Sequence, residues 1–320
     1  MVRILVIGGT GHIGSYLVPR LVLDGHEVQV VARHPSPQYT DARLAWDQVA
    51  WVIADRAAEE REGTWSQRMG SIEADVVVDL ICYTPEQHRT MVQAFEGRVT
   101  HLLHCGTIWA YGHPERIPYR ESDLRRPISD YGKMKAAIEA ELIEQYRRTG
   151  FPATIIHPGH ISGRKWLPID PQGTRNGVGV YRKLARGETV ELPQFGQETL
   201  QHVHADDVAQ LFGSAIIHRE RALGESFSAV APYAMSLVGL CGFVASLFGR
   251  DPDIRFVPHD GMESLLGSAA WAATKDHLEH SPCCSIEKAQ HLLGYRPRYT
   301  TEQIYVECLE YLLESGELVI

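Results

Sequence analysis

The sequence contains no uninterrupted apolar run as long as the roughly 18 residues that a membrane-spanning helix needs, so we expect no membrane segment. Its longest apolar stretch, residues 236–248, is broken by two glycines and is typical of a helix that faces a core. The first residues, MVRILVIGG, lack the charged, apolar and small-residue segments of a signal peptide and instead predict a strand. We therefore expect a cytoplasmic protein without a membrane partner.

Positive charge is also scarce. The chain has 31 Lys and Arg against 40 Asp and Glu, which gives a formal net charge of -9. Proteins that bind nucleic acid neutralise phosphates with a concentrated basic surface, so this balance argues against DNA or RNA as a partner. A chain of 320 residues, 44% of them apolar, is nevertheless long enough for a substantial core in one large domain or two coupled ones.

Cysteines with the spacing of a disulfide framework or a metal site are missing. The six cysteines include no CxxC, and only residues 283 and 284 lie close together, so we expect reduced, buried thiols. The 16 histidines form several near pairs, among them His202 and His204. No third cluster of ligands is evident in the sequence, and we therefore expect no metal site.

What the sequence does contain is an alternation of strand and helix patterns in its first half, which predicts parallel strands joined by helices. The strand segments are short, rich in Val, Ile and Leu, and mostly not alternating, as is typical of strands covered on both faces. The predicted strands are 4–7, 28–32, 49–53, 76–80, 101–105 and 154–157, and the predicted helices between them include 12–23, 85–95 and 131–148.

After residue 158 the pattern loosens into Gly- and Pro-rich loops with a helix at 178–186. A strand-to-helix turn at 202–217 is expected to return to the main sheet, and 254–257 is a further short strand. We predict an α/β fold in which a doubly wound parallel sheet carries a smaller C-terminal α/β domain over its carboxyl edge, where such sheets bind ligands. The predicted domains are 1–162 with 200–222 for a dinucleotide, and 163–199 with 223–320 for the substrate.

A glycine-rich turn separates the first strand from the first helix. It fits G-x-G-x-x-G from Gly9 and G-x-x-G-x-x-G from Gly8. Glycine permits the tight turn, lets the backbone approach a pyrophosphate and allows the helix to pack closely on the strand. The helix N-terminus then offers free amides to the phosphates. The turn therefore predicts a dinucleotide site at Gly8, Thr10, Gly11, His12, Ile13 and Gly14.

The end of the second strand distinguishes the two nicotinamide dinucleotides. It reads Val31-Ala32-Arg33-His34 and has no carboxylate to hold both ribose hydroxyls. Because Arg33 can pair with a 2′-phosphate, we favour NADP(H), with NAD(H) as the alternative if Arg33 only stacks on adenine or faces solvent. Asp55, at the end of the third strand, is expected either to bond the adenine amino group or to cap a turn.

Tyr131 and Lys135 form a Tyr-x-x-x-Lys pair on a predicted helix, and residues four apart share a helix face. An unperturbed tyrosine titrates near pH 10, and a neighbouring ammonium lowers that pKa by favouring the phenolate. Such pairs are common on helices, but this one follows the fifth strand of a predicted cofactor-binding sheet. We therefore interpret Tyr131 and Lys135 as an acid–base pair, with Lys135 also holding the nicotinamide ribose.

Together these motifs resemble the extended short-chain dehydrogenase/reductase family, which contains nucleotide-sugar epimerases and dehydratases. The resemblance covers the glycine turn, the segment 107–112, the Tyr131–Lys135 pair, residues 157–159 and 204–208, and the late segment 293–297. It implies a Rossmann fold and homodimers, gives Thr107 the role of polarising the substrate oxygen, and places Leu80 and His157 beside the cofactor. It also implies a structural role for Asp207.

The sequence departs from the family at positions that concern the substrate. Sugar-nucleotide enzymes often have an arginine that contacts the diphosphate, and this chain has Leu200 in its place. The family's Arg-Pro after the sixth strand is replaced here by His157-Pro158. These changes are similar to a divergent, reductase-like branch. We therefore predict an NADP(H)-dependent oxidoreductase acting on a small polar molecule. The alternatives are an epimerase or dehydratase with tightly bound NAD(P) and, less favoured, a non-catalytic binding protein, although Tyr131, Lys135 and the glycines are all retained.

The substrate residues are predicted only from their positions near the carboxyl edge of the sheet. They are Thr84, Trp109, His160, Trp166, Asn176 and Gln201. Their mixture of ring and polar side chains indicates a polar substrate with some apolar surface.

Overall fold

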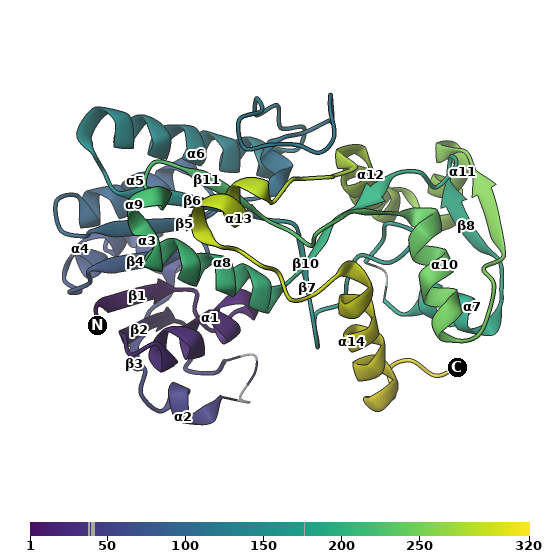
Figure 1. Cartoon of the computed structure of the whole chain (residues 1–320), viewed down its shortest axis with the longest axis horizontal. Helices are drawn as coiled ribbons and strands as arrows, with labels where there is room; N and C mark the ends of the chain where they lie inside the picture. The colour runs from purple at the N-terminus through teal and green to yellow at the C-terminus, as the bar shows by residue number, and fades with distance from the viewer. Residues whose placement is uncertain (38, 40–41, 176) are drawn as a thin grey trace.

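Apolar residues on both faces of the predicted strands require a sheet covered on both sides. In the computed structural model, which describes residues 1–37, 39, 42–175 and 177–320, these strands form one seven-stranded parallel sheet (Figure 1). Its order is β11-β6-β5-β4-β1-β2-β3, so the strand order reverses beside β1. The strands are β1 (Arg3–Ile7), β2 (Glu27–Ala32), β3 (Ala50–Ile53), β4 (Val76–Asp79), β5 (His101–Cys105), β6 (Ala153–Pro158) and β11 (Ser226–Ala229).

Alternate residues of β1 enter two different cores. Ile4 and Val6 pack with residues of α1 (His12–Leu23) and α8 (Ala205–Ile217), whereas Leu5 and Ile7 pack with residues of α5 (Pro85–Phe95) and α6 (Asp130–Thr149). Both faces of the sheet are therefore buried, as the sequence pattern predicts. The remaining helices of this lobe are α2 (Arg43–Trp46), α3 (Arg56–Glu62), α4 (Trp65–Gly70), η1 (Ile108–Ala110), α9 (Arg219–Ala222) and α13 (Glu287–Leu293).

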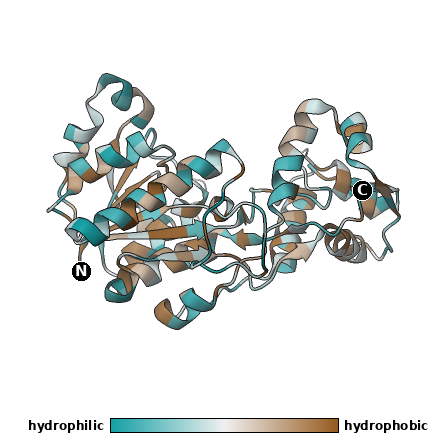
Figure 2. Ribbon diagram, turned by 90° about the horizontal axis from the view of Figure 1, so that it is seen from above, coloured by the Kyte–Doolittle hydropathy of each residue, from teal (hydrophilic) through white to brown (hydrophobic). Residues whose placement is uncertain are grey.

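A smaller lobe with its own apolar core lies beyond the carboxyl ends of the strands (Figures 1 and 2). Its helices are α7 (Gly179–Arg186), α10 (Leu237–Leu247), α11 (His259–Leu266), α12 (Ser268–His280) and α14 (Thr301–Glu314). Three two-stranded sheets link or cover them: β7 (His160–Ser162) with β10 (His202–His204), β9 (Thr199–Leu200) with β12 (Met235–Ser236), and β8 (Val190–Pro193) with β13 (Ile254–Val257).

The predicted fold class is confirmed, but one predicted strand is misplaced. Residues 202–204, expected in the main sheet, pair with β7 as β10, while the following helix α8 does return and packs against α1. The seventh strand is β11, from a segment that the sequence pattern assigns to the smaller domain. A stretch reading Ser-Phe-Ser-Ala carries little strand signal of its own, and its pairing with β6 is decided by tertiary contacts. The two-domain division itself stays a prediction.

Three further sequence features can be compared with the structure. Across the parts of the chain that it describes, no helix is long and apolar enough to cross a membrane. All six cysteines are free thiols, and five of them are buried, as expected. Among the described residues, no three His, Cys, Asp or Glu side chains lie together in a group that could hold a metal ion.

Candidate active site

The glycine turn joins β1 to the buried helix α1 at the point where the strand order reverses. Gly8 has φ of +81°, and a Cβ there would lie 2.7 Å from the Ile81 side chain. A Cβ on Gly14 would lie 2.2 Å from the Gly9 carbonyl oxygen, so only glycine allows α1 to start this close to the turn. Gly11 faces open space, where an added Cβ would touch only the Gly8 carbonyl oxygen, at 3.4 Å.

A groove of about 420 Å³ runs from this turn across the ends of β2 and β3. Five of the predicted cofactor residues line it: Gly8, Thr10, Gly11, Arg33 and Asp55. Asp55 also caps α3, because its carboxylate accepts a hydrogen bond from the Ala58 amide at 3.1 Å. Ile13, Gly14 and Leu80 are buried beside the groove and do not line it.

A buried ion pair forms part of the groove wall. Arg56 donates to both carboxylate oxygens of Asp79 at 2.9 Å and to Glu60 at 2.6 Å. Both Arg56 and Asp79 are almost fully buried. Arg56 and Asp79 therefore neutralise each other's charge. Among the described residues of this groove, the exposed Arg33 is the arginine that is not paired with a carboxylate.

Tyr131 and Lys135 lie in the first turns of α6, which Ser129 caps through the Gly132 amide. The Lys135 ammonium is buried and donates to the carbonyl oxygens of Cys82 and Cys105 at 2.7 and 2.6 Å. It lies 5.8 Å from the centre of the Tyr131 ring. The ends of β4 and β5 thus hold the cation beside the phenol.

Thr107 follows β5 and is buried against Tyr131. The Thr107 side chain acts to lower the pKa of the Tyr131 phenol, but partial burial acts more strongly and leaves that pKa above its ordinary value. Burial has the opposite effect on the cation and lowers the pKa of Lys135, because it disfavours the charged form of each group. The expected lowering of the Tyr131 pKa by Lys135 is therefore wrong for this structure, because the ammonium is bonded to two carbonyls and desolvation of the phenol dominates.

His157 lies behind Thr107, although the resemblance places it beside the cofactor. It is fully buried, and its Nδ1 accepts a hydrogen bond from the Thr107 amide at 3.0 Å. Since Nδ1 accepts, Nε2 carries the proton and donates it to Glu139 at 3.0 Å. Burial acts to raise the pKa of Glu139, but His157 and Arg125 together hold it below its usual range. The result is a chain of hydrogen bonds from Arg125 through Glu139 and His157 to Thr107.

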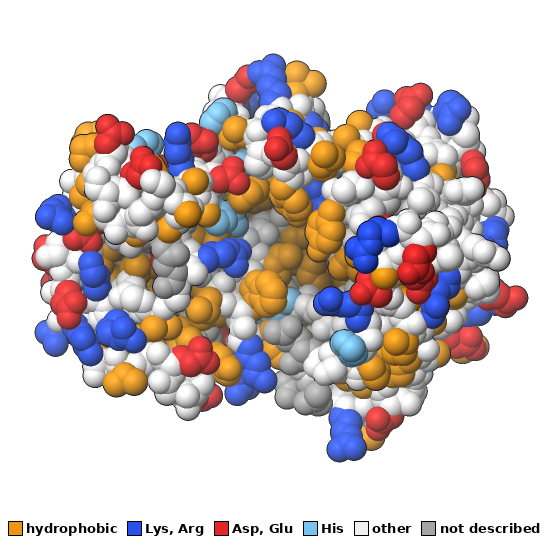
Figure 3. Space-filling model, turned by 180° about the vertical axis from the view of Figure 1, so that it is seen from behind, with side chains coloured by type: hydrophobic (Ala, Val, Ile, Leu, Met, Phe, Trp, Pro, Cys, Tyr) orange, Lys and Arg blue, Asp and Glu red, His pale blue; other side chains and the backbone are white. Residues whose placement is uncertain are grey.

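A second cavity, of about 320 Å³, adjoins Thr107 and Tyr131. Three of the predicted substrate residues line it, namely Trp109, His160 and Trp166. On the surface, apolar side chains gather in a hollow between the two lobes (Figure 3). The other residues that line the cavity at Thr107 and Tyr131 are His12, Gly159, Ile161, Arg175 and His277.

Two predicted substrate residues, Thr84 and Gln201, do not line this cavity. Thr84 caps α5, where its hydroxyl accepts from the Gln87 amide at 3.3 Å. Gln201 is fully buried and bonded to the backbone of Ala231 and Cys284. Asn176 lies outside the described residues. His12, predicted for the cofactor, instead stacks on Trp166, with ring centroids 5.2 Å apart.

Two further residues of the cavity, Arg175 and His277, carry no motif that marks them in the sequence. Arg175 belongs to a Gly- and Pro-rich loop in which no periodic pattern indicates which side chain turns inward. His277 comes from α12, which carries no motif, and only the tertiary fold brings it beside His160, with ring centroids 5.5 Å apart. The one weak signal was the abundance of histidine.

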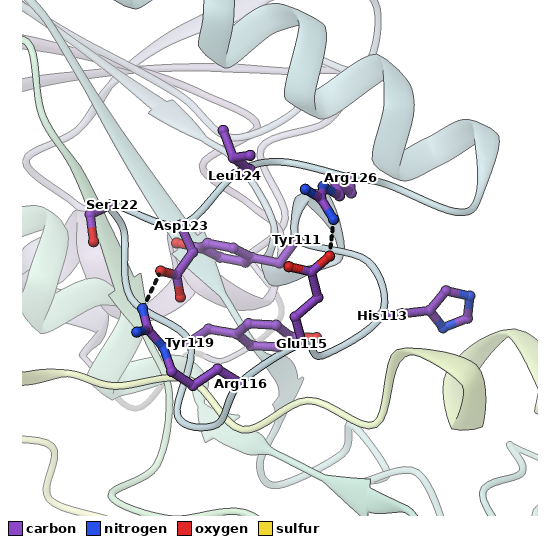
Figure 4. Close-up of a pocket in the computed structure, with 9 residues that line it drawn as sticks. All are labelled: Tyr111, His113, Glu115, Arg116, Tyr119, Ser122, Asp123, Leu124 and Arg126. Atoms are coloured by element: carbon purple, nitrogen blue, oxygen red, sulfur yellow. Dashed lines mark hydrogen bonds and ion pairs between the residues drawn. The ribbon is translucent and has the colours of Figure 1, made fainter.

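A further hollow, of about 410 Å³, lies along the segment between η1 and α6 (Figure 4). It is larger than the cavity at Tyr131, but both of its arginines face acids: Arg116 pairs with Asp123 at 3.1 Å and Arg126 pairs with Glu115. None of the predicted catalytic residues lines it. We therefore place the candidate active site at Tyr131 and not here.

Comparison with known proteins agrees with this geometry. A family model described as the NAD dependent epimerase/dehydratase family matches residues 4–229. The chain is 25% identical over 303 residues to the chloroplast stem-loop binding protein of 41 kDa b of Arabidopsis thaliana, covering 93% of this chain and 75% of that protein. It is 27% identical over 328 residues to UDP-glucose 4-epimerase of Streptococcus mutans, covering 92% of each. The structure of UDP-glucose 4-epimerase with UDP-glucose from Thermotoga maritima superposes with a TM-score of 0.72 at 21% identity, over 98% of this chain and 99% of that one.

Proposed function

The chain belongs to the NAD dependent epimerase/dehydratase family, and we propose that within this family of enzymes it is an NADP(H)-dependent oxidoreductase. The proposed reaction exchanges a hydride between the cofactor and the carbonyl or alcohol carbon of a small polar substrate. The observation that carries the proposal is that Thr107 and Tyr131 together line the wall of a cavity that also reaches His12, at the start of α1.

The residues of the groove fit a dinucleotide. Gly11 leaves a cradle that a side chain would fill, and the first amides of α1 point from the same turn. Glycine there lets phosphate oxygens approach the backbone, and the positive end of the helix dipole favours their charge. Gly8, Thr10 and Gly11 would hold the diphosphate, and Arg33 and Asp55 would flank the adenosine.

The preference for NADP(H) rests on Arg33. It follows β2, lies exposed at the edge of the groove and has no carboxylate beside it at the strand end. A guanidinium pairs well with a phosphate, whereas an acid at this place would repel it. Asp55 is one strand further away and is engaged with the amide of Ala58, so it does not occupy the position from which an acid would select NAD(H).

In the reductive direction, Thr107 and Tyr131 bond the substrate carbonyl oxygen, and the raised pKa of Tyr131 keeps its proton available for donation. A dinucleotide held by Gly8, Thr10 and Gly11 would supply the hydride that the carbonyl carbon needs. As Tyr131 transfers its proton to the substrate oxygen, the Lys135 ammonium stabilises the phenolate that remains. His157 holds the Thr107 amide and so keeps the hydroxyl in place.

An epimerase is the second candidate, favoured by the similarity to the Streptococcus mutans enzyme over 92% of both chains. It would use the same residues and would return the hydride to its substrate in each turnover. The size of the cavity and Leu200, in place of the family's frequent arginine, support the reductase instead.

The name of the Arabidopsis relative indicates binding to a nucleic-acid stem-loop. The net charge of -9 and the retention of Tyr131, Lys135 and the glycine turn support a catalytic role for this chain. A homodimer, a cytoplasmic location and a small-molecule substrate complete the proposal.

The deciding experiment identifies any nucleotide released when freshly purified protein is denatured, and then titrates the emptied protein with NADPH and NADH. Reversible binding that favours NADPH is expected for the reductase. Stoichiometric nucleotide that stays bound through purification would contradict it and favour the epimerase, because such an enzyme recycles its cofactor in place.

A further inference from the structure

The residues that line the cavity at Tyr131 include a positively charged side chain and no acidic one. Among its lining residues there is one guanidinium, from Arg175, and no Asp or Glu. The acid of the same loop, Asp170, is buried and accepts hydrogen bonds from the amides of Gln172 and Thr174 at 2.8 and 2.9 Å. It is therefore engaged within the loop and does not face the cavity as a counter-charge.

Arg175 differs from three other arginines near the cavity. Arg56 and Arg125 are each bonded to a buried carboxylate, and Arg126, on the rim of the neighbouring hollow, is paired with Glu115. Among the described residues, by contrast, no carboxylate pairs with Arg175. A guanidinium that faces a concave surface without a partner is the usual arrangement for binding a carboxylate or phosphate.

Two imidazoles reinforce this preference. His160 is 5% exposed, lines the cavity, and its buried Nε2 has no hydrogen-bond partner in the described part of the chain. The buried Nδ1 of His277 is likewise without a partner. Burial lowers the pKa of both rings, that of His277 to about 4, and the charge of Arg175 acts in the same direction. Both rings are thus neutral at pH 7, and the single N–H of a neutral imidazole, where it is placed on the nitrogen of His160 that has no partner, can be donated to an anion.

We propose that this cavity takes carbonyl substrates that carry one anionic group, a carboxylate or a phosphate, with Arg175 as the counter-ion and His160 as a neutral donor. The assignment rests on the proposed function, since Tyr131, which lines the same cavity, would act on the carbonyl of the same molecule. The cavity volume, about 320 Å³, is near the lower limit of ligand pockets, about 300–1,000 Å³. A compact anion fits this volume better than a nucleotide-linked one.

The test measures anion binding directly, without turnover. NADPH-saturated protein is titrated with acetate, inorganic phosphate and neutral acetamide, and tryptophan fluorescence reports occupancy because Trp109 and Trp166 line the cavity. We expect acetate or phosphate to bind at least about tenfold more tightly than acetamide, as a single charge-assisted hydrogen bond provides. The better of the two anions identifies the group. Equal binding of acetamide overturns the proposal.

Two arginine variants make the test specific. Arg175→Gln should weaken anion binding about tenfold or more, whereas Arg175→Lys should retain phosphate better than acetate because lysine keeps the charge but not the two-pronged geometry. Arg126→Gln, at an exposed arginine outside the cavity, is the matched control and should leave binding unchanged. An unchanged affinity in Arg175→Gln, or an equal loss in the control, would overturn the inference.

NADPH oxidation with carbonyl compounds is measured in parallel and tests the proposed function separately. If anions bind through Arg175 but no carbonyl compound is reduced, the reductase proposal fails and the anion site stands. If carbonyl compounds are reduced but anion binding does not depend on Arg175, the reductase stands and the anion site fails.

Discussion

At the level of single residues, the chemistry depends on where the Tyr131 proton resides. Partial burial raises the pKa of the phenol, while Thr107 acts to lower it, and the Lys135 ammonium lies 5.8 Å from the centre of the ring. We expect Tyr131→Phe to lower kcat by about 10²–10⁴-fold, the usual contribution of a general acid. The dissociation constant for NADPH should stay unchanged, because Tyr131 does not line the groove at the glycine turn. Steady-state kinetics and an NADPH titration would measure both, and retained turnover would contradict the mechanism.

Arg33 is the residue on which cofactor choice depends. Replacing it with alanine should weaken NADPH binding about 10–100-fold, the equivalent of one charge-assisted hydrogen bond of about 1.5–3 kcal/mol. NADH binding should change little, since NADH lacks the 2′-phosphate. Fluorescence titrations of both cofactors give the ratio, with Arg116→Ala, an exposed arginine outside the groove, as the control. Equal losses for NADPH and NADH would show that Arg33 does not contact the 2′-phosphate.

His157 is a positioning residue, and its two nitrogens can be tested one at a time. An asparagine can present an oxygen near the place of Nδ1 and keep the bond to the Thr107 amide, whereas a glutamine reaches further, toward Glu139. We expect His157→Gln to lose about tenfold in kcat and His157→Asn to lose less, with KM for NADPH unchanged in both, because one hydrogen bond is worth about 1 kcal/mol. Equal effects of the two substitutions on kcat would contradict a role through Thr107.

At the level of secondary-structure elements, the sequence predicted the helices and strands whose formation depends on neighbouring residues. The first six strands and helices α1, α5 and α6 lie where apolar runs and helix signals place them. β11 was missed because four residues reading Ser-Phe-Ser-Ala become a strand only through pairing with β6. For the same reason β10, three residues long, could not be assigned to its partner β7 from sequence.

The residues of the site fall into the same two groups, those that local motifs predict and those that only tertiary packing brings together. Gly8, Arg33, Tyr131 and Lys135 are fixed by motifs that follow single strands, so the sequence placed them on the cofactor side of the sheet. His277 reaches the cavity from α12, and no periodicity of that helix relates it to the glycine turn. Side chains from the smaller lobe depend on how it packs over the sheet, which is a tertiary property.

The start of α1 is set by one close approach, and this can be tested. Gly14→Ala places a Cβ where 2.2 Å separates it from the Gly9 carbonyl oxygen, so α1 or the turn must shift. We expect a loss of about 1–3 kcal/mol in the free energy of unfolding, typical of overpacking, and weaker NADPH binding. Gly242→Ala is the matched control, since nothing lies within 4 Å of its added Cβ in α10. Denaturation curves and NADPH titrations would measure both effects, and equal behaviour of the two variants would contradict the argument.

At the level of the whole molecule, the fold buries many histidines in neutral form. Burial lowers the pKa of rings in both lobes, including two on strand β5 of the main sheet. The histidines with the largest lowering are His12, His88, His101, His104, His160, His202 and His277.

These rings predict an acid-sensitive protein. The unfolded chain binds protons at each histidine near pH 6.5, whereas the folded pKa of His88 is about 4 and that of His202 about 3. Below pH 6.5 the unfolded state therefore binds more protons, and stability, full above that pH, falls by about 1.4 kcal/mol per pH unit for each such histidine until the folded pKa is reached. Urea denaturation between pH 7.5 and about 5 would measure the slope.

One substitution checks the cause of that slope. His88→Gln, on α5 and away from the cavity at Tyr131, should make the pH dependence less steep by about 1.4 kcal/mol per pH unit. A slope identical to that of the unmodified protein would show that the buried histidines are not responsible.

The two hydrogen bonds that hold the Lys135 ammonium affect how this sequence can change during evolution. The two partners of Lys135 are main-chain oxygens at the ends of β4 and β5. Every amino acid supplies such an oxygen, so mutation of Cys82 or Cys105 cannot delete either partner. A lineage is therefore free to exchange side chains around the ammonium, and to remodel the lobe that meets the substrate, while it inherits an intact reaction centre.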